Sequence, residues 1–536
     1  MSEQNKVSKQ NKVSRRGFMK TAATGIVGLA VGAGIGYSAG SSMVPGGGPG
    51  ATVTVTGPGS ADFPFNLPRE GSTVAERAIN AAKSLLEQHP EWKGTELVLA
   101  CVGGYEPGFN AMKKRWESET GLKVTVATTP IPEFFEKMMI EAVSKTGNID
   151  LINAQTMFLS DLAEARLLYD LGDAAMWIDI REHGRPDGYI YPLDYSIPYY
   201  KGNLYGFLQD GDVQLLYYRT DYFEDPKEKD DFESQYGYTL EPPKTMFEYR
   251  DISEFFTRPP DLYGTAEFRE LTRNSFTYYL YVTAKKWPNW YYFDDNMKPQ
   301  LTVREAIEGG ELYVENLKNM PPNQAELTGL SSIQAFGEGK VVLCIGAPST
   351  ARVAEDPQAV SRGKWNTYPI PGYRIAGPDG KEVLNRRSVN LASWSICVSN
   401  YSRKKELGVC LASFFSDPDV LVDAMIAPGT WHDPTRYSHV GPNAPARLKD
   451  VRGPVLNAFL DNAEILAPML AGIRGSTEYN TTLSKNLHAA QVGSMDIMTA
   501  LQATEQQWEE ITDRLGRDLQ IEGWEEIKKF YPTITI

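Results

Sequence analysis

Polar and aromatic side chains follow two apolar runs of the sequence, at points where a binding site could form. Tyr105 and Glu106 come after the apolar run 97–102, and Gln155 and Thr156 follow the apolar run 149–153. Phenol, carboxylate, amide and hydroxyl groups exchange hydrogen bonds, and an aromatic ring adds an apolar face. These residue types favour recognition of a small molecule that carries both hydroxyl groups and CH faces.

Motifs for metal, nucleotide and cofactor chemistry are missing from the sequence. It has no H-E-x-x-H, no Walker A and no G-x-G-x-x-G after a strand. The four cysteines lie in apolar runs without a C-x-x-C pair, which disfavours zinc and iron–sulfur sites and predicts buried free thiols. These cysteines are Cys101, Cys344, Cys397 and Cys410. We expect no catalytic residue, no metal and no cofactor.

The stretch "SRRGFMK" at 14–20 precedes a neutral, Gly- and Ala-rich segment up to residue 44. This pattern resembles the twin-arginine export signal, in which Arg15 and Arg16 are the paired arginines and the partner is the twin-arginine translocase. The neutral segment is also long enough to span a bilayer of ~30 Å. Residues 1–44 are therefore predicted to be an export signal that is either cleaved or kept as a membrane anchor, so the protein is placed in the periplasm or on the outer face of the cytoplasmic membrane.

Length and charge limit what the rest of the chain is. Its 536 residues exceed one hydrophobic core, so two or more domains are expected. Residues 1–20 carry net +5, and removing them from the total of −14 leaves −19 on the remainder. Such a surface repels nucleic acid. Residues 45–72, rich in Gly, Pro and Thr, are expected to be a linker.

The pattern of apolar residues predicts alternating strands and helices. Residues 97–102 form an apolar strand, residues 108–119 an amphipathic helix that Gly121 ends, and residues 124–127 a second strand. Residues 149–153 repeat the strand after another helix, and a helix capped by Ser72 or Thr73 precedes the whole unit. Parallel strands in such units bring the loops at their carboxyl ends together, so Tyr105 and Gln155 are expected at one edge.

Seven segments, in this order and spacing, resemble the extracellular solute-binding proteins that feed ABC importers, in the carbohydrate-binding group that includes maltose-binding protein. The likeness covers about residues 95–515. The segments are "ETGLKVTV", "TGNIDLINAQ" with "EARLLYDL", "GNLYGFLQDGDVQLLYYRTDYF", "PPKTMFEY", "AFGEGKVVLCIGAP", "SWSICVSNYSRKKELGVCLASFF" and "ALQATEQQWEEITDRL".

The resemblance implies an α/β, two-lobe periplasmic-binding-protein type II fold, in which each lobe is a mixed or mostly parallel sheet flanked by helices. The chain would cross between lobes near 209–212, 370–388 and 425–430. Residues 73–94 would form an N-terminal helix. Lobe 1 would comprise 95–208 and 388–426, and lobe 2 would comprise 209–387 and 427–536. The polar break "QDGD" between two apolar strands also indicates a hinge.

The resemblance further implies which residues contact a ligand. Asp212 takes the place of a cleft carboxylate at the hinge. "LTRNSFTYYLY" matches a segment of polar and aromatic sugar contacts, which favours Arg273, Asn274 and Tyr278. Ser349 stands where many relatives carry a stacking tryptophan, and Trp394 or Trp431 could replace that ring. The aromatic cluster at 285–295 is expected on the surface of a lobe.

The resemblance implies a binding protein that closes around a sugar or related polyol and delivers it to a membrane permease. Two alternatives remain open on the residues alone. A cationic solute such as a polyamine suits aromatic walls with carboxylates, and an exported glycoside hydrolase would use two carboxylates. The sequence does not specify the identity, size or linkage of the ligand.

Overall fold

The computed structural model describes residues 70–530, except 173, 175–187, 191–192, 194–198, 323, 327, 391–392, 468 and 471. The predicted export signal with Arg15 and Arg16, and the predicted linker up to residue 69, lie outside the described residues. Among the described residues, no helix combines the length and the hydropathy that a membrane span needs.

The first lobe is built on a five-stranded sheet with the strand order β2-β1-β3-β13-β6. Its strands are β1 (Glu96–Val102), β2 (Lys123–Thr129), β3 (Leu151–Gln155), β6 (Gly206–Asp210) and β13 (Trp394–Val398). β1 pairs in parallel with β2 and β3, whereas β13 runs antiparallel to both β3 and β6. The sheet is mixed, and two of its strands come from segments that are distant in sequence.

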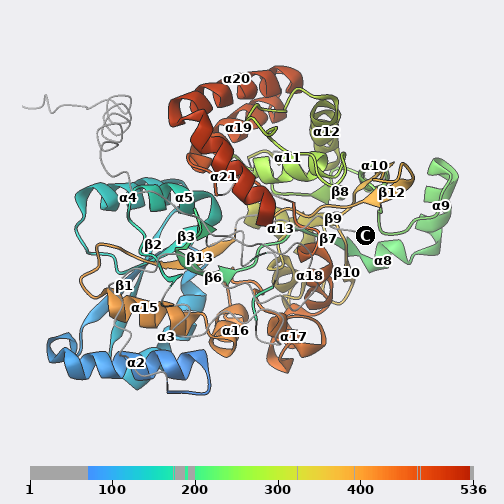
Figure 1. Cartoon of the computed structure of the whole chain (residues 1–536). Coiled ribbons are helices and arrows are strands. Elements are labelled where there is room, and N and C mark those ends of the chain that lie inside the picture. Colours follow the sequence, from blue (N-terminus) through green and yellow to red (C-terminus); the bar gives the residue numbers. More distant parts are fainter. Residues whose placement is uncertain are drawn as a thin grey trace, which may run out of the picture. The chain divides into compact units, whose positions relative to one another are not determined.

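Helices cover both faces of this sheet (Figure 1). They are α2 (Val74–Gln88), α3 (Glu106–Thr120), α4 (Ile131–Ser144), α5 (Thr156–Glu164) and α15 (Lys405–Phe415). α4 and α5 lie on one face, and α2, α3 and α15 lie on the other. Two predicted boundaries are confirmed: Thr73 forms a capping box with Glu76, and Gly121 ends α3 in the left-handed conformation.

The second lobe is built on a four-stranded sheet with the order β10-β7-β9-β8. Its strands are β7 (Leu215–Arg219), β8 (Tyr263–Ala266), β9 (Val341–Gly346) and β10 (Trp365–Tyr368). Only β8 and β9 pair in parallel, so this sheet is mixed as well. Thr245 begins α10 (Met246–Phe256), and its side chain forms a capping box with Glu248.

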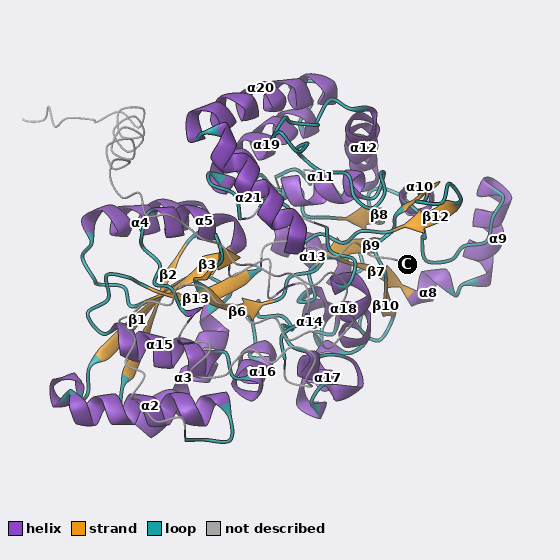
Figure 2. Ribbon diagram, in the orientation of Figure 1, coloured by secondary structure: helices purple, strands orange, loops and turns teal. Residues whose placement is uncertain are grey.

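The remaining elements of the described chain lie around these sheets (Figure 2). They are β4 (Tyr199–Tyr200), β5 (Asn203–Leu204), α8 (Thr220–Phe223), α9 (Pro226–Tyr236), α11 (Asn274–Thr283), α12 (Arg304–Glu315), α13 (Gly329–Gly337), α14 (Thr350–Ala354), β11 (Tyr373–Ala376), β12 (Glu382–Asn385), α16 (Pro418–Ile426), α17 (Ala446–Arg452), α18 (Val455–Ala463), α19 (Ser476–Gln491), α20 (Ile497–Leu515) and α21 (Arg517–Phe530). β11 and β12 form a hairpin within the predicted second crossing.

The sheets show where the chain passes between the lobes. It leaves lobe 1 after β6, returns to it between β12 and β13, and leaves again after α16. The α/β class with two lobes is confirmed. One side-chain prediction is wrong: in the cluster 285–295, Trp290, Tyr292 and Phe293 are no more than 2% exposed, because they pack with Tyr279 and Trp508 in the core of lobe 2.

Burial accounts for the cysteines. All four thiols are free and buried, as the apolar runs around them predict. Burial is also the main cause that raises their pKa, to about 12 for Cys101. A thiol that resists ionisation is a poor nucleophile, so these residues act as small apolar core residues.

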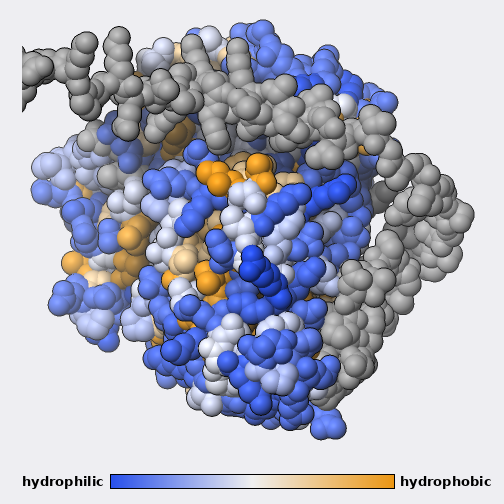
Figure 3. Space-filling model, turned by 90° about the vertical axis from the view of Figure 1, so that its left-hand side faces the viewer, coloured by the Kyte–Doolittle hydropathy of each residue, from blue (hydrophilic) through white to orange (hydrophobic). Residues whose placement is uncertain are grey.

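The face of lobe 1 that carries α2 and α4 is largely hydrophilic where it is coloured, and its apolar side chains gather in small separate groups (Figure 3). On α4, Ile140 and Val143 are 50% and 79% exposed. Isolated exposed apolar residues are ordinary on protein surfaces.

Candidate functional site

A cavity of about 380 Å³, its mouth included, opens between the two lobes. The lining residues are Tyr105, Asp212, Phe268, Arg273, Gly329, Leu330, Ile333, Ala347, Ser349 and Trp431. Five of them, Tyr105, Asp212, Arg273, Ser349 and Trp431, belong to the residues that the sequence singled out.

The lining comes from both lobes. Tyr105 precedes α3 at the carboxyl end of β1, and Trp431 is tied to the same turn because its N–H donates to the Gly104 carbonyl over 2.8 Å. From lobe 2, Arg273 precedes α11, Ser349 precedes α14, and the first turn of α13 contributes Gly329 and Leu330. Asp212 lies between β6 and β7, in the first crossing segment.

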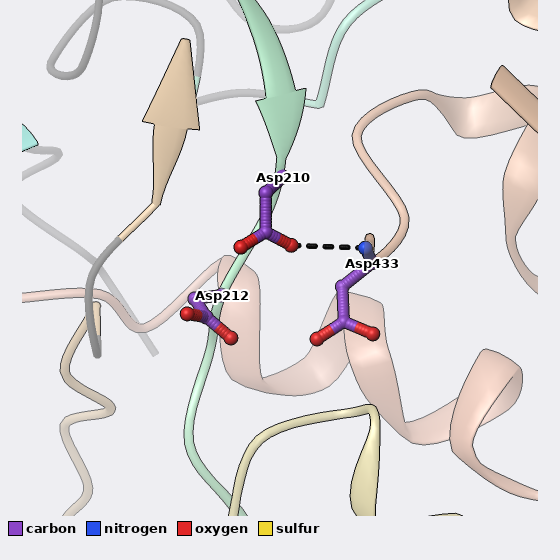
Figure 4. A group of neighbouring side chains, drawn as sticks. All are labelled: Asp210, Asp212 and Asp433. Atoms are coloured by element: carbon purple, nitrogen blue, oxygen red, sulfur yellow. Dashed lines mark hydrogen bonds between the residues drawn. The ribbon is translucent and has the colours of Figure 1, made fainter. Parts of the chain in front are cut away.

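Three carboxyl groups lie close together, and one of them, that of Asp212, lines the cavity (Figure 4). Oxygen atoms of Asp210, Asp212 and Asp433 lie within 4.8 Å of one another, and all three side chains are buried. Asp210 accepts from the Tyr105 hydroxyl over 2.5 Å and from the Asp433 N–H over 2.9 Å. Hydrogen bonds thus join the turn after β1, the end of β6 and the loop after α16.

A buried ion pair holds Asp433. Arg452 donates to Asp433 over 3.0 Å and to the carbonyls of His432 and Met425, and all of its side chain is buried. The Ser349 N–H donates to the other oxygen of Asp433 over 3.3 Å. One guanidinium therefore fixes the loop that presents Trp431 to the cavity.

Asp212 differs from its two neighbours. Among the described residues, no N–H group and no hydroxyl donates a hydrogen bond to its carboxyl group, although the residue is only 6% exposed. The charge of the Arg273 guanidinium lowers the pKa of Asp212, although the two side chains make no contact ion pair in the described chain. Asp212 therefore offers acceptor capacity to a ligand in the cavity.

Burial and mutual repulsion raise the pKa values of the three carboxyl groups. The pKa values of Asp210 and Asp212 are raised well above the ordinary range, first by burial and then by neighbouring carboxylates. Burial also raises the pKa of Asp433 to about 6, because Arg452 offsets only part of it. The pKa of His432 falls to about 3 through burial and the charge of Arg452, so this imidazole is neutral.

The three carboxylates are also the one group of the described residues whose spacing would suit a metal ion. However, a guanidinium, a phenol and two backbone N–H groups already occupy oxygens of Asp210 and Asp433. We therefore assign no metal to them.

Arg273 crosses the cavity. Its guanidinium carbon lies 5.6 Å from the ring centroids of both Trp431 and Phe268, and it donates to Glu270 over 3.2 Å. Most of its N–H groups remain free of protein acceptors in the described chain, so they can donate to a ligand.

The other predicted contact residues lie elsewhere. Glu106 is exposed and accepts from Asn110, and Gln155 and Thr156 are buried beneath the rim, where Thr156 bonds the Ser393 carbonyl. Asn274 and Tyr278 are buried on α11 and bond the carbonyls of Ser484 and Ala306. The geometry does not bring these five residues to the cavity, because each is committed to its own lobe.

Trp394 has a supporting position. It is 1% exposed, and its ring lies 5.1 Å from the ring of Tyr105. It does not line the cavity but packs against a residue that does. Of the two tryptophans proposed to replace a ring at Ser349, only Trp431 reaches the cavity.

Sequence reasoning missed Phe268, the start of α13, Asp210, Asp433 and Arg452. Asp210 stands in the quoted break "QDGD" and Asp433 two residues after Trp431, so charge next to a predicted crossing was the available signal. Arg452 gave no signal, because a single arginine on an ordinary helix is usually at the surface.

Comparisons with known proteins agree with this geometry. A family model described as bacterial extracellular solute-binding protein matches residues 111–441. No curated protein sequence matches the chain.

Several solved structures have a similar fold. Maltose-bound MalE3 from T. maritima has a TM-score of 0.63 and 16% identity, covering 78% of this chain and 100% of that one. An ABC transporter solute-binding protein from Agrobacterium vitis S4 with bound D-mannitol has a TM-score of 0.63 and 17% identity, covering 79% and 99%. One from Agrobacterium radiobacter K84 in complex with ribitol has a TM-score of 0.64 and 16% identity, covering 78% and 99%.

Likeness at these identities shows the fold, whereas the family match extends over more than half of the sequence. The chain thus belongs to the bacterial extracellular solute-binding protein family.

Proposed function

We propose that this chain is the exported solute-binding component of an ABC importer and that it captures a sugar or related polyol in the cavity between its lobes. The observation that carries the proposal is the lining of the cavity. Asp212 offers carboxyl oxygens, Arg273 offers donors, and the rings of Tyr105 and Trp431 offer apolar faces. Hydroxyl groups and CH faces of a sugar need these partners.

The similar structures support the ligand class. They hold maltose, D-mannitol or ribitol, which are neutral molecules rich in hydroxyl groups. The resemblance implies that many relatives carry a stacking tryptophan where this chain has Ser349, and the ring of Trp431, which also lines the cavity, supports a replacement for it. Closure of the two lobes around the solute would present it to the membrane permease.

Export is part of the same proposal. Membership in an extracellular family makes this an exported protein, and "SRRGFMK" supports the twin-arginine translocase as the route. The neutral segment up to residue 44 would be cleaved or would tether the protein to the outer face of the membrane.

The proposed role includes no catalysis. A glycoside hydrolase needs two carboxyl groups flanking the scissile bond, whereas Asp212 is the one acidic residue among the described residues that line the cavity. Asp210 and Asp433 lie behind it and are held by Tyr105 and Arg452.

A cationic solute is the second candidate. Among the described residues, Asp210 and Asp212 have no basic group within the 4 Å of an ion pair, although Asp433 does. An ammonium group placed against Asp212 would supply that charge, and aromatic walls attract cations. Arg273 in the same cavity opposes such a ligand, so we favour a neutral one.

Calorimetry on the purified chain with maltose, D-mannitol, ribitol and spermidine tests the proposal. A neutral polyol that binds should stabilise the fold by ~2.7 kcal/mol at 100 times its dissociation constant, and Asp212→Ala should weaken it. Binding of spermidine alone would favour the second candidate. Hydrolysis of maltose by the purified chain would contradict a purely binding role.

A further inference from the structure

We propose that Asp210 and Asp433 are positioning residues that keep one proton on the Asp210–Asp212 pair when the cleft is closed, so that solute binding takes up a proton. This inference rests on the proposed function, because it assumes that the solute binds in the cavity beside Asp212. It assigns a role to two carboxyl groups that the solute does not touch.

The geometry of the three carboxyl groups carries the first step. Their oxygen atoms lie within 4.8 Å of one another and away from solvent. Like charges this close in a buried site do not all ionise at neutral pH, and one proton is shared among them. Arg452 compensates Asp433 over 3.0 Å, which leaves the Asp210–Asp212 pair to hold the proton.

The other charged and titratable groups around the Asp210–Asp212 pair do not neutralise the charge that the shared proton compensates. Arg273 before α11 and Arg352 on α14 contribute positive charge, yet neither forms a contact ion pair with Asp210 or Asp212 in the described chain. Tyr105 before α3 is a neutral phenol that donates to Asp210. His432 in the loop after α16 is neutral as well.

Closure supplies the second step. Asp212 lies in the crossing segment and lines the cavity, so opening of the lobes would let water reach its carboxylate. Water stabilises the charged form, whereas closure removes that water and favours the protonated form. On closure a hydronium ion or a buffer acid transfers a proton to a carboxylate oxygen of the pair: the bond from the donor to hydrogen breaks, the carboxyl O–H bond forms, and the conjugate base stays in the solvent.

The direction of the pH effect follows from linkage. If the pair has a higher pKa when closed than when open, closure binds protons, and the affinity for a neutral solute falls as the pH rises between the two pKa values. If one proton is taken up on binding, the affinity falls at most tenfold for each unit by which the pH rises. A protonated carboxyl group donates one hydrogen bond and still accepts others, so it can serve a hydroxyl ligand in both directions.

Infrared spectroscopy at pH 7.5, on the solute-free chain and on the chain saturated with D-mannitol, ribitol or maltose, tests the shared proton directly. We expect the stretching band of a protonated carboxyl group to grow when the parent is saturated, and we expect Asp210→Asn and Asp212→Asn each to abolish this gain. Glu270→Gln is the matched control, because burial also raises the pKa of Glu270, which lies outside the triad. A parent that does not gain this band on saturation, or a gain that only Glu270→Gln removes, overturns the proposal.

Calorimetry in two buffers of different ionisation enthalpy tests the coupling to binding, with D-mannitol, ribitol and maltose as probes. The parent should take up between zero and one proton per bound probe, more at pH 7.5 than at pH 5, and Asp212→Asn should bind with no pH dependence. Tight binding that is independent of pH in the parent overturns the coupling and leaves the proposed function intact. If none of the three probes binds, the ligand class fails, and the solute-free spectrum decides about the proton alone: a carboxyl band that Asp212→Asn removes supports a shared proton, and the lack of such a band overturns it.

Discussion

Gly104 and Trp431 fit together so closely that a Cβ atom on Gly104 would lie 2.2 Å from the indole ring. Gly104 also adopts φ +94°, and its carbonyl accepts from the Trp431 N–H over 2.8 Å. The turn after β1 and the loop after α16 therefore fix each other's position. The indole ring of Trp431 can reach the cavity because Gly104 has no side chain.

Gly104→Ala should displace Trp431 and weaken solute binding. The left-handed backbone and the steric overlap each cost about 1–3 kcal/mol, and urea denaturation measures their effect on the free energy of unfolding. Gly103→Ala is the control, because a Cβ there meets nothing within 4 Å. Equal stability and affinity in the two variants would contradict this account of the turn.

Asp212→Ala should reduce affinity for a neutral sugar by ~10- to 150-fold, because charge-assisted or multiple hydrogen bonds of roughly 1.5–3 kcal/mol are lost. Asp212→Asn keeps the shape and one acceptor oxygen, so its effect should be milder. For a cationic ligand, Asn should be nearly as damaging as Ala, and binding should weaken strongly with salt. Calorimetry at two salt concentrations separates the two cases, and parental affinity in both variants would remove Asp212 from the site.

Arg452→Met should destabilise the protein by about 3–5 kcal/mol, because it leaves the buried Asp433 without its partner. Arg447→Met on the same helix is the matched control. Arg447 is 39% exposed and pairs with Asp419 and Asp423 at the surface, where such pairs contribute about 0–1 kcal/mol. Chemical denaturation should separate the two variants. A similar loss of unfolding free energy in both would show that the buried ion pair stabilises the fold no more than the surface pair does.

Asp161 should make stability depend on pH. It lies on α5 and accepts from the N–H groups of Gly475 and Thr477 at the start of α19, and burial raises its pKa from 3.8 to about 6. Because the folded state holds the proton more tightly, stability should fall by up to about 3 kcal/mol as the pH rises from 4 to 6.5. Asp161→Asn should lose this dependence in urea titrations at several pH values.

Asp496, a helix-capping residue whose pKa is lowered rather than raised, provides the control for Asp161. Asp496 is exposed before α20, and hydrogen bonds from Thr499 lower its pKa. Its contribution is present above the unfolded pKa and is lost as the pH falls, so Asp496→Asn should remove a pH effect of opposite sign. Parallel pH profiles for the two variants would contradict the assignment of a raised pKa to Asp161.

Replacing Arg15 and Arg16 together by Lys should keep the protein in the cytoplasm without altering its fold. Fractionation of cells measures the distribution. Replacement of Lys9 and Lys12 by Arg is the control, since it conserves charge outside the pair. Export that continues in a strain without the twin-arginine translocase would reject this route.

Local signals in the sequence were sufficient to predict where some helices begin and end. Thr73 and Thr245 begin helices through capping boxes, and Gly121 ends α3, because each effect is decided within four residues of the chain. The strand-end rule selected Tyr105, which lines the cavity, but it also selected Gln155 and Thr156, which do not. Asp212 was found only through a resemblance to a family.

Contacts between distant segments were beyond sequence reasoning. Asn274 and Tyr278 carry plausible groups for a site, yet α19 and α12 occupy them. Asp433 and Arg452 meet because the loop after α16 folds back onto α17, and nothing in their neighbours along the chain encodes that return. Tyr292 and Phe293 pack against Trp508 on α20, a helix that lies far along the sequence from them.

The way α2 is attached has a mechanical consequence. Its buried alanines pack against α15, and the Ala75 N–H donates to Asp417 at the start of α16, so α2 is part of lobe 1. Any force applied to the chain before residue 70 therefore acts on the five-stranded sheet. If the protein is held at that end, lobe 1 stays fixed and lobe 2 rotates about the hinge. Lobe 2 is then the lobe whose orientation toward the membrane permease changes on closure.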